Sequence, residues 1–196
     1  EKAKRIRDNY FPKSVLNPDQ IVGLDLIMPE AVNLKFISAP LSKEQLADLR
    51  RRHVGFVFQS YNLVPTLSAV ENVMLALDLR DIRGADAHDL AVLALEEVGL
   101  GHRVNAAPSK MSGGEKQRVA IARSLAGSPS VILAVEPTAA LDSKRAGIVM
   151  DLLRKLAAEH DACIVAVTHD EKIFGRFDHI FTLRDGALET ATPLAA

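Results

Sequence analysis

The chain has 196 residues, of which 48% are apolar and 25% charged, and its formal net charge is −1. These values are typical of a globular chain with one sizeable core, or with a core domain that carries a small subdomain. The near-neutral charge excludes an overall basic field for nucleic acid or anionic lipid, and no apolar run is long enough to span a bilayer.

Cysteine and histidine usage predicts neither disulfides nor a structural metal. Cys163 is the single cysteine and lies inside the apolar run ACIVAV, and the six histidines never recur at the i, i+4 spacing of a helical zinc site. The N-terminal sequence EKAKRIRDNYF lacks the apolar core of a signal peptide. We therefore expect a chain in a reducing compartment, with the cytoplasm as the default.

The first predicted elements are a helix over residues 43 to 53 and a strand over VGFVF at 54 to 58. We interpret the basic run Arg50 to Arg52 as a solvated helix end rather than a phosphate-binding patch. A second helix follows in SAVENVMLALDL, where Ser68 and Glu71 stand in capping-box register. Its apolar face is expected to consist of Val70, Val73, Met74 and Leu77.

Two further helices are predicted before the chain returns to strands. Residues 86 to 98 form the first, and a loop, GLGHRVNAAPSK, separates it from a helix that begins near Ser112 and ends at Gly127. The residues of 86 to 98 expected to be available for packing are Leu90, Leu93, Ala94 and Val98.

From residue 131 onward, strands and a helix alternate. The strands are VILAV, ACIVAVT and HIFTL, with a turn at Asp185-Gly186, and the helix is DSKRAGIVMDLLRKLAAEH. Strands that are apolar on both faces predict a parallel sheet covered on both sides. The fold class is therefore α/β, with a core over 1–59 and 127–196 and a helical insert over 60–126. Inward-facing residues of the helix are expected to be Val149, Leu152, Leu153 and Leu156.

Three polar side chains directly follow apolar strands. They are Gln59 after VGFVF, Glu136 after VILAV, and His169 after ACIVAVT. Each alone could be a loop residue bonded to backbone. Because ligands of open parallel sheets lie beyond the carboxyl ends of the strands, the three together predict a ligand site.

The stretch MSGGEKQRVAIAR at 111 to 123 is a second candidate. Ser112-Gly113-Gly114 at a helix start offers a hydroxyl and unobstructed backbone N–H groups at the positive end of the helix dipole, which suits an anion. The same residues are equally typical of a helix cap with a flexible approach, and the sequence does not choose between the two.

Taken together, these motifs resemble the ATP-binding subunit of an ABC transporter. MSGGEKQRVAIAR resembles the family's signature motif with Met111 in place of Leu, and Gln59 resembles the Q-loop glutamine. VILAVEPTAALD resembles Walker B and the D-loop ending at Asp142, and Thr168-His169-Asp170 resembles the switch-histidine region. The similarity covers about residues 42 to 188, and RRRHVGFVFQSYNLVPTLSAVENV is most similar to ATPases of lipoprotein release and macrolide efflux.

This resemblance implies a P-loop NTPase-like (RecA-like) core with an inserted helical subdomain, and it assigns roles. Glu136 would orient or deprotonate the attacking water, His169 would hold the γ-phosphate, and Gln59 would contact the metal and relay nucleotide state. Ser112, Gly113, Gly114 and Glu115 would serve the nucleotide of a second subunit, with Asp142 at the dimer interface. The implied cofactors are ATP and Mg²⁺. The implied partners are transmembrane permease subunits at the inner face of the cell membrane and a second ATP-binding subunit, with no nucleic acid.

Two features depart from the family pattern. No G-x-x-x-x-G-K-[ST] motif occurs, and its only trace is Lys13-Ser14, with Arg7 and Pro12 where the glycines would be. Only twelve residues precede Lys13, so the family's N-terminal sheet would be truncated. The second departure is Val135, which stands where the family carries the aspartate that holds Mg²⁺ through water. The chain's own nucleotide site is therefore expected to be degenerate.

The retained Glu136, Gln59 and His169 leave other interpretations open. Recent decay, a truncated gene or deliberate alteration would explain their presence equally well. The chain could also be an active transport ATPase with an atypical N-terminus in which Lys13 binds phosphate, or a non-enzymatic module that uses the helical insert to dock on a permease.

Overall fold

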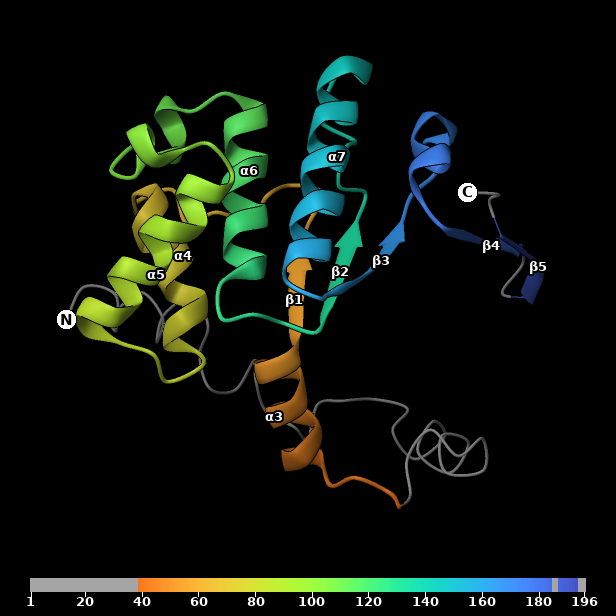
Figure 1. Cartoon of the computed structure of the whole chain (residues 1–196), viewed down its shortest axis with the longest axis horizontal. Helices are drawn as coiled ribbons and strands as arrows, with labels where there is room; N and C mark the ends of the chain where they lie inside the picture. The colour runs from red at the N-terminus through yellow and green to blue at the C-terminus, as the bar shows by residue number, and fades with distance from the viewer. Residues whose placement is uncertain (1–38, 185–186, 194–196) are drawn as a thin grey trace.

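Three short parallel strands form the sheet at the centre of the chain (Figure 1). The computed structural model describes residues 39–184 and 187–193. The strands are β1 (Val54–Val57), β2 (Val131–Val135) and β3 (Cys163–Val167), in the order β1-β2-β3. Val131 pairs with Val54 on one side and with Cys163 on the other, so the carboxyl ends of all three strands lie at one edge of the sheet. The predicted parallel α/β arrangement is confirmed.

One face of this sheet is packed against two helices, α6 (Gly113–Leu125) and α7 (Ser143–Glu159). Because side chains alternate along a strand, Val57, Ile132 and Ala134 share this face, and all three are buried. The helices contribute buried apolar side chains in return, which include Ile121 and Leu153. Figure 1 shows α6 and α7 side by side on this face, each with its N-terminus at the edge where the strands end.

The opposite face of the sheet differs from the sequence-based expectation. Val135, Val165 and Val167 are 43%, 51% and 62% exposed, so residues 39–184 and 187–193 leave this face uncovered. The prediction of a sheet covered on both sides is therefore wrong for the part of the chain that the structure describes. The apolar residues of a strand show which faces of the sheet can be buried. They do not show which element covers each face, because that depends on the tertiary structure.

Helices α4 (Ala69–Asp78) and α5 (Gly84–Glu97) pack together and against α6. The predicted capping box at the start of α4 is confirmed, because the Ser68 side chain accepts from the Glu71 N–H and the Glu71 carboxylate accepts from the Ser68 N–H. In α5 the expected packing face is wrong in part. Ala94 and Val98 are buried as predicted, but Leu90 and Leu93 are 42% and 55% exposed. Ala87, Ala91 and Leu95 complete the buried face. Small alanines let α5 approach its neighbours closely, and the larger leucines point away.

Asn72 in α4 holds the preceding loop and is fully buried. Its Oδ1 accepts from the Val64 N–H at 2.8 Å, and its amide group donates to the carbonyl oxygens of Val64, Leu67 and Ser68. The Val64 and Ser68 carbonyls also accept from the backbone N–H groups of Leu67 and Asn72, so the groups that depend on the Asn72 side chain are the Val64 N–H and the Leu67 carbonyl.

The substitution Asn72→Leu should destabilise the fold by about 2 to 4 kcal/mol, because it leaves the Val64 N–H and the Leu67 carbonyl unpaired while conserving side-chain volume. Urea denaturation would measure this loss. The exposed Asn105→Leu is the matched control and should change stability by less than about 0.5 kcal/mol. Equal effects of the two substitutions would contradict the role assigned to Asn72.

The remaining elements lie around this core. Helix α3 (Lys43–His53) leads directly into β1. Near its basic C-terminal end, Arg51 and Arg52 both form ion pairs with Asp48. Short 3₁₀ turns occur within the predicted loop at η2 (Gly101–Arg103) and η3 (Pro108–Lys110), and also at η4 (Glu171–Arg176). Strands β4 (His179–Arg184) and β5 (Ala187–Pro193) form a separate antiparallel pair, and the predicted turn at residues 185–186 lies outside the described residues.

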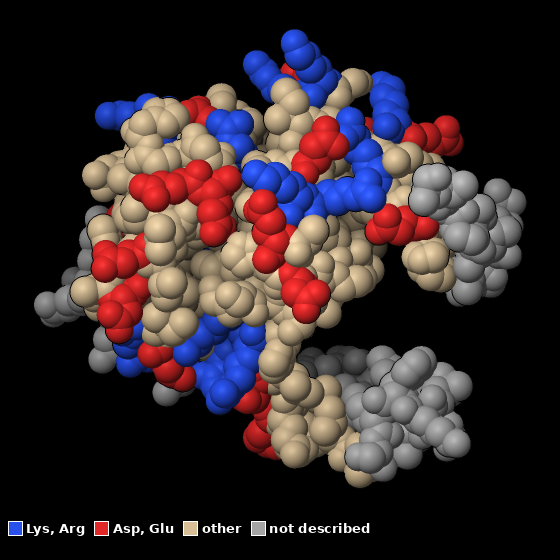
Figure 2. Space-filling view, in the orientation of Figure 1, with Lys and Arg blue, Asp and Glu red and all other residues tan. Residues whose placement is uncertain are grey.

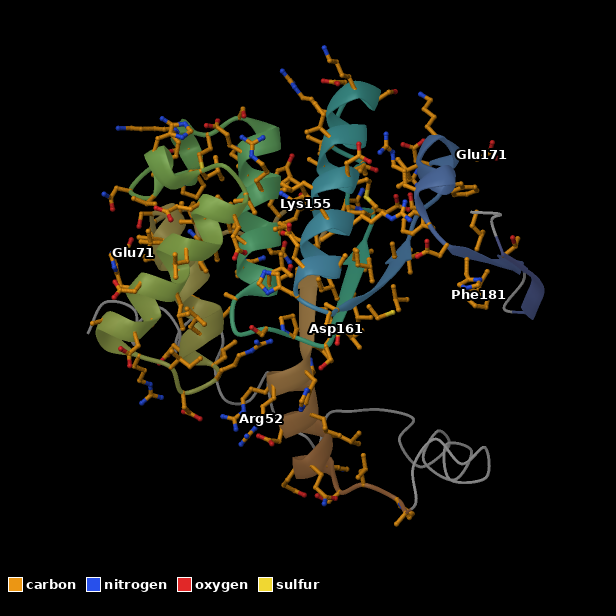
Figure 3. All side chains as sticks on the ribbon, viewed as in Figure 1. Arg52, Glu71, Lys155, Asp161, Glu171 and Phe181 are labelled. Carbon is orange, nitrogen blue, oxygen red and sulfur yellow. The ribbon has the colours of Figure 1, made fainter. Side chains whose placement is uncertain are left out.

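The described surface carries both signs of charge. Figure 2 shows basic and acidic side chains interspersed over the helices of this face, rather than one continuous basic area. Phe181 projects from β4 and is largely exposed (Figure 3). Among the described helices, none has the length and apolar character needed to cross a membrane.

Candidate functional site

Glu136 follows β2 directly and is held by the residues that follow β3. Its backbone N–H donates to the Val167 carbonyl at 2.8 Å, and its φ of 46° turns the chain out of the strand in a left-handed conformation. The carboxylate then meets three groups. Oε1 lies 2.7 Å from His169 Nδ1 and accepts from the His169 N–H at 3.2 Å, while Oε2 accepts from the Thr168 hydroxyl at 3.2 Å. The Glu136 carboxylate therefore has a fixed orientation at the sheet edge.

His169 contacts Glu136 through one ring nitrogen and leaves the other exposed. The imidazole is largely open to solvent, whereas the Glu136 side chain is mostly covered. With Nδ1 donating to the carboxylate, Nε2 points outward and can accept a hydrogen bond in the neutral ring or donate one in the protonated ring. The Nε2 atom of His169 is therefore the part of the pair that is available to a ligand at this edge of the sheet.

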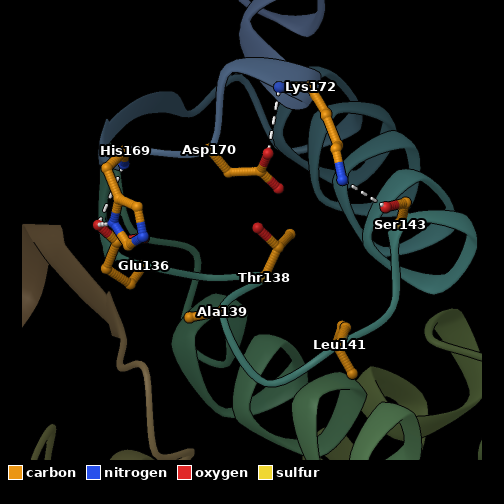
Figure 4. A pocket seen from close by; sticks show the side chains of 8 residues that line it. All are labelled: Glu136, Thr138, Ala139, Leu141, Ser143, His169, Asp170 and Lys172. Carbon is orange, nitrogen blue, oxygen red and sulfur yellow. Dashed lines mark hydrogen bonds and ion pairs between the residues drawn. The ribbon is translucent and has the colours of Figure 1, made fainter.

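A pocket of about 290 Å³ adjoins this pair (Figure 4). In it, Lys172 Nζ donates to the Ser143 hydroxyl at 3.1 Å, and Asp170 Oδ1 accepts from the Lys172 N–H at 3.1 Å. The Thr138 hydroxyl is buried without a hydrogen-bond partner among the described residues. The lining residues are Glu136, Thr138, Ala139, Leu141, Ser143, His169, Asp170 and Lys172.

Gln59 lies at the same edge of the sheet. Val57 pairs with Ala134 and Val135 pairs with Val167, so the residues that follow each strand stand side by side. Gln59 is exposed and begins a tight loop in which Tyr61 and Asn62 both have positive φ. The structure therefore brings the three strand-end residues of the sequence analysis to one edge.

Val135 occupies the last position of β2, next to Glu136. An apolar side chain offers no ligand to a metal ion, and no group of three His, Cys, Asp or Glu side chains able to hold one occurs in residues 39–184 and 187–193. Position 135 therefore offers no carboxylate to Mg²⁺, and we assign no step to a metal. Lys13 and Ser14, the candidate phosphate-binding pair, lie outside the described residues.

The start of α6 is a capped helix end. The Ser112 hydroxyl accepts from the Glu115 N–H, and the Glu115 carboxylate accepts from the Ser112 N–H at 2.8 Å. This N–H is the main reason that the pKa of Glu115 lies below its ordinary value. The cap leaves the N–H groups of Gly113 and Gly114 outside the capping box, and a Cβ added to Gly114 would meet no atom within 4 Å. Both interpretations of this stretch are thus compatible, since a capped end can still present free donors.

Asp142 caps the next helix. Its Oδ1 accepts from the Arg145 N–H at 2.9 Å at the start of α7, and the preceding Ala139 and Ala140 are exposed. A Cβ on Gly113 would lie 3.1 Å from the Tyr61 hydroxyl and about 4 Å from the Ala140 carbonyl. The start of α6, the turn before Asp142 and the loop after Gln59 are therefore neighbours in one chain.

A family model described as ABC transporter matches residues 24–139, more than half of the chain. The chain belongs to the ABC transporter family. The match covers β1, α4 to α6 and β2, and so includes Gln59, the start of α6 and Glu136, whereas Thr168, His169 and the other residues after position 139 lie beyond it.

Relatives within the ABC transporter family agree with this assignment. The chain is 44% identical over 149 residues to the uncharacterized ABC transporter ATP-binding protein YbbA of Escherichia coli K12, covering 76% of this chain and 65% of that protein. It is 42% identical over the same length to the lipoprotein-releasing system ATP-binding protein LolD of a Shewanella species, covering 76% and 64%. The chain thus spans slightly less than two thirds of these relatives.

Solved structures of ABC proteins share the fold. The dimeric structure of MJ0796, a bacterial ABC transporter cassette, is 40% identical with a TM-score of 0.69, covering 82% of this chain and 72% of that one. A post-hydrolysis state of the same cassette, bound to ADP and Pi, is 42% identical with a TM-score of 0.68, covering 80% and 69%. These similarities confirm the predicted P-loop type of α/β fold.

The sequence did not identify three side chains that hold the loops of the ABC site through hydrogen bonds, which are Thr168, Gln117 and Arg123. In the sequence, Thr168 is marked only as a neighbour of His169, and Gln117 and Arg123 only as members of the stretch MSGGEKQRVAIAR. Gln117 is buried and donates to the Pro137 carbonyl at 2.7 Å, next to Glu136. A buried glutamine in an amphipathic helix gives no sign of which distant carbonyl it contacts, so the pattern alone could not have identified this role.

Proposed function

We propose that this chain is an ATP-binding subunit of an ABC-type transporter whose own nucleotide site is degenerate. In this proposal, Ser112, Gly113 and Gly114, with the turn before Asp142, serve the nucleotide of a partner subunit. The observation that carries it is Val135. It leaves the strand end beside Glu136 without a metal ligand, while the start of α6 is capped, with Ser112 exposed and open space beside Gly114.

Dimer formation follows from the same proposal. MJ0796, at 40% identity, is described as dimeric, and a state of that protein holds ADP and Pi. Helix starts with free N–H groups favour anions such as phosphate. A partner subunit with an intact glycine loop would place its nucleotide against Gly113 and Gly114 of this chain, so that one active site forms across the dimer.

Residues at this chain's own edge keep part of their geometry. His169 and Thr168 fix the carboxylate of Glu136, which in a competent site would orient or deprotonate a water molecule. Bound Mg²⁺ would supply charge neutralisation at the phosphate oxygens in that chemistry. Since Val135 offers this ion no ligand, we propose that Glu136 and His169 act here as a structural pair.

Coupling to a membrane partner is also part of the proposal. Gln59 lies in an exposed loop at the sheet edge, where it could report nucleotide state to permease subunits on the cytoplasmic side of a membrane. The relative LolD is named as part of a lipoprotein-releasing system, and a related substrate class is the first to examine for this chain.

Hydrolysis by the purified chain tests the degenerate site. We expect phosphate release from ATP at the level of the buffer background, and Glu136→Gln should leave it there, because the missing metal ligand already blocks the reaction. A coupled-enzyme phosphate assay measures both proteins. Hydrolysis that is present in the original chain and abolished by Glu136→Gln would contradict the proposal and support an active ATPase instead.

A further inference from the structure

Arg123 holds the loop that carries Gln59. Its Nη2 donates to the Tyr61 carbonyl at 2.7 Å and its Nη1 donates to the Asn62 carbonyl at 2.5 Å. Desolvation lowers the pKa of Arg123 to about 10, so the guanidinium remains charged at neutral pH. No carboxylate pairs with it within the described parts of the chain, so its charge is directed at these two carbonyl oxygens.

The loop needs such support because its backbone is strained. Tyr61 has φ of 62° and Asn62 has φ of 46°. A left-handed conformation is unfavourable for a non-glycine residue, and tyrosine is a less favourable residue there than asparagine. Two charge-assisted hydrogen bonds from one planar guanidinium are of the size that offsets this strain.

Tyr61 extends the connection to the other end of α6. Its carbonyl meets Arg123 near the C-terminus of the helix, and its hydroxyl lies against Gly113 at the N-terminus. Tyr61 therefore connects the loop after β1, where Arg123 bonds its carbonyl, to the first turn of α6, where its hydroxyl lies. Gln117, halfway along the same helix, contacts the loop after β2 through the Pro137 carbonyl.

We propose that Arg123 is a positioning residue which, through Tyr61, fixes the Gln59 loop to the first turn of α6, so that the two move as one body. A change at Gln59 would then be transmitted within one chain to the Ser112 to Gly114 surface. The link itself depends only on the contacts above. Its use in sensing nucleotide rests on the function proposed in the preceding section.

Amide hydrogen exchange measured by NMR on the full chain without nucleotide tests this link. The loop probes are the amides of Tyr61 and Asn62, which donate to Phe58 and Ser60, and the helix probes are those of Glu115 and Lys116, which donate to Ser112. Arg123→Met removes the donors but keeps a long side chain. We expect all four amides to exchange about tenfold faster or more, while amides of α4 keep their rates.

The matched variant Arg123→Lys keeps the charge but not the planar fork, and it should show a smaller acceleration in the same four amides. Unchanged rates at Tyr61 and Asn62 in Arg123→Met would overturn the proposal. Equal acceleration throughout the described chain would also overturn it, because Arg123 would then contribute only to overall stability.

Tyr61→Phe provides a second test if the methionine variant does not fold. It keeps the ring and the backbone contact with Arg123 but removes the hydroxyl beside Gly113. We expect faster exchange at Glu115 and Lys116 with Asn62 unchanged, and no change at Glu115 and Lys116 would overturn the relay. Because nucleotide is absent, these results are independent of whether the chain's own site proves degenerate.

Discussion

ATP should bind this chain with a Kd of about 1 mM or weaker, and removal of Mg²⁺ should change that affinity by less than about twofold. Tight retention of the phosphates would require the backbone donors of a glycine loop and a metal ion that neutralises phosphate charge. The sequence contains no G-x-x-x-x-G-K-[ST] motif, and Val135 stands beside Glu136 where a carboxylate would be needed. Isothermal titration calorimetry with Mg²⁺ and with EDTA would measure both quantities.

The same calorimetric measurement should be made on the variant Val135→Asp. It places a second carboxylate next to Glu136, yet without a phosphate cradle the affinity for MgATP should stay near the millimolar range. An ordinary micromolar, Mg²⁺-dependent affinity in the unmodified chain would contradict the degenerate site. If only Val135→Asp reached that affinity, a phosphate cradle would exist, and Lys13 and Ser14 would be the residues to examine.

Gly55→Ala should destabilise the fold by about 3 kcal/mol or more. Gly55 lies in β1, and a Cβ at this position would overlap the carbonyl oxygen of Ser124 and lie 3.2 Å from Pro129 Cγ. The obstacle is backbone, so α6 must move away from the sheet. Because α6 also contacts the loops after β1 and β2, this shift would disturb the candidate site as well as the core.

Urea denaturation followed by circular dichroism measures the effect of Gly55→Ala. Gly114→Ala is the matched control, since its added methyl group meets no atom within 4 Å and alanine is favoured over glycine in a helix by about 1 kcal/mol. We expect Gly114→Ala to equal or exceed the original stability. A loss below about 1 kcal/mol for Gly55→Ala would show that α6 and β1 are not in close contact.

Most secondary structure could be predicted because its causes are local. The start of α4 depends on Ser68 and Glu71, which lie three residues apart, and the three strands follow from short apolar runs. The strand-end positions of Gln59, Glu136 and His169 could be inferred as well, because parallel strands end at a common edge. The hydrogen bonds among Glu136, Thr168 and His169 could not, since they join residues more than thirty positions apart.

Which side chains are buried was harder to predict from the sequence. The helical periodicity of α5 is compatible with a face through Leu90 and Leu93, yet the structure buries the alanine side and exposes these leucines. Periodicity identifies a helix, but it does not show which of two possible apolar faces packs against the neighbouring helices α4 and α6. The exposed Val135, Val165 and Val167 show the same limit for the sheet, because an apolar face indicates that cover is favourable without naming what supplies it.

The sequence by itself determined the parallel α/β class, the helix starts, the motif order and the absence of a carboxylate at position 135, because each is a property of neighbouring residues or of residue identity. Only the tertiary structure decided that Gly55 must be a glycine and that Arg123 and Tyr61 join two motifs. Tyr61 and Arg123 stand 62 positions apart, and Gly55 lies far from Ser124 along the chain. Such contacts depend on how helix α6 packs on the strand β1, which no local pattern encodes.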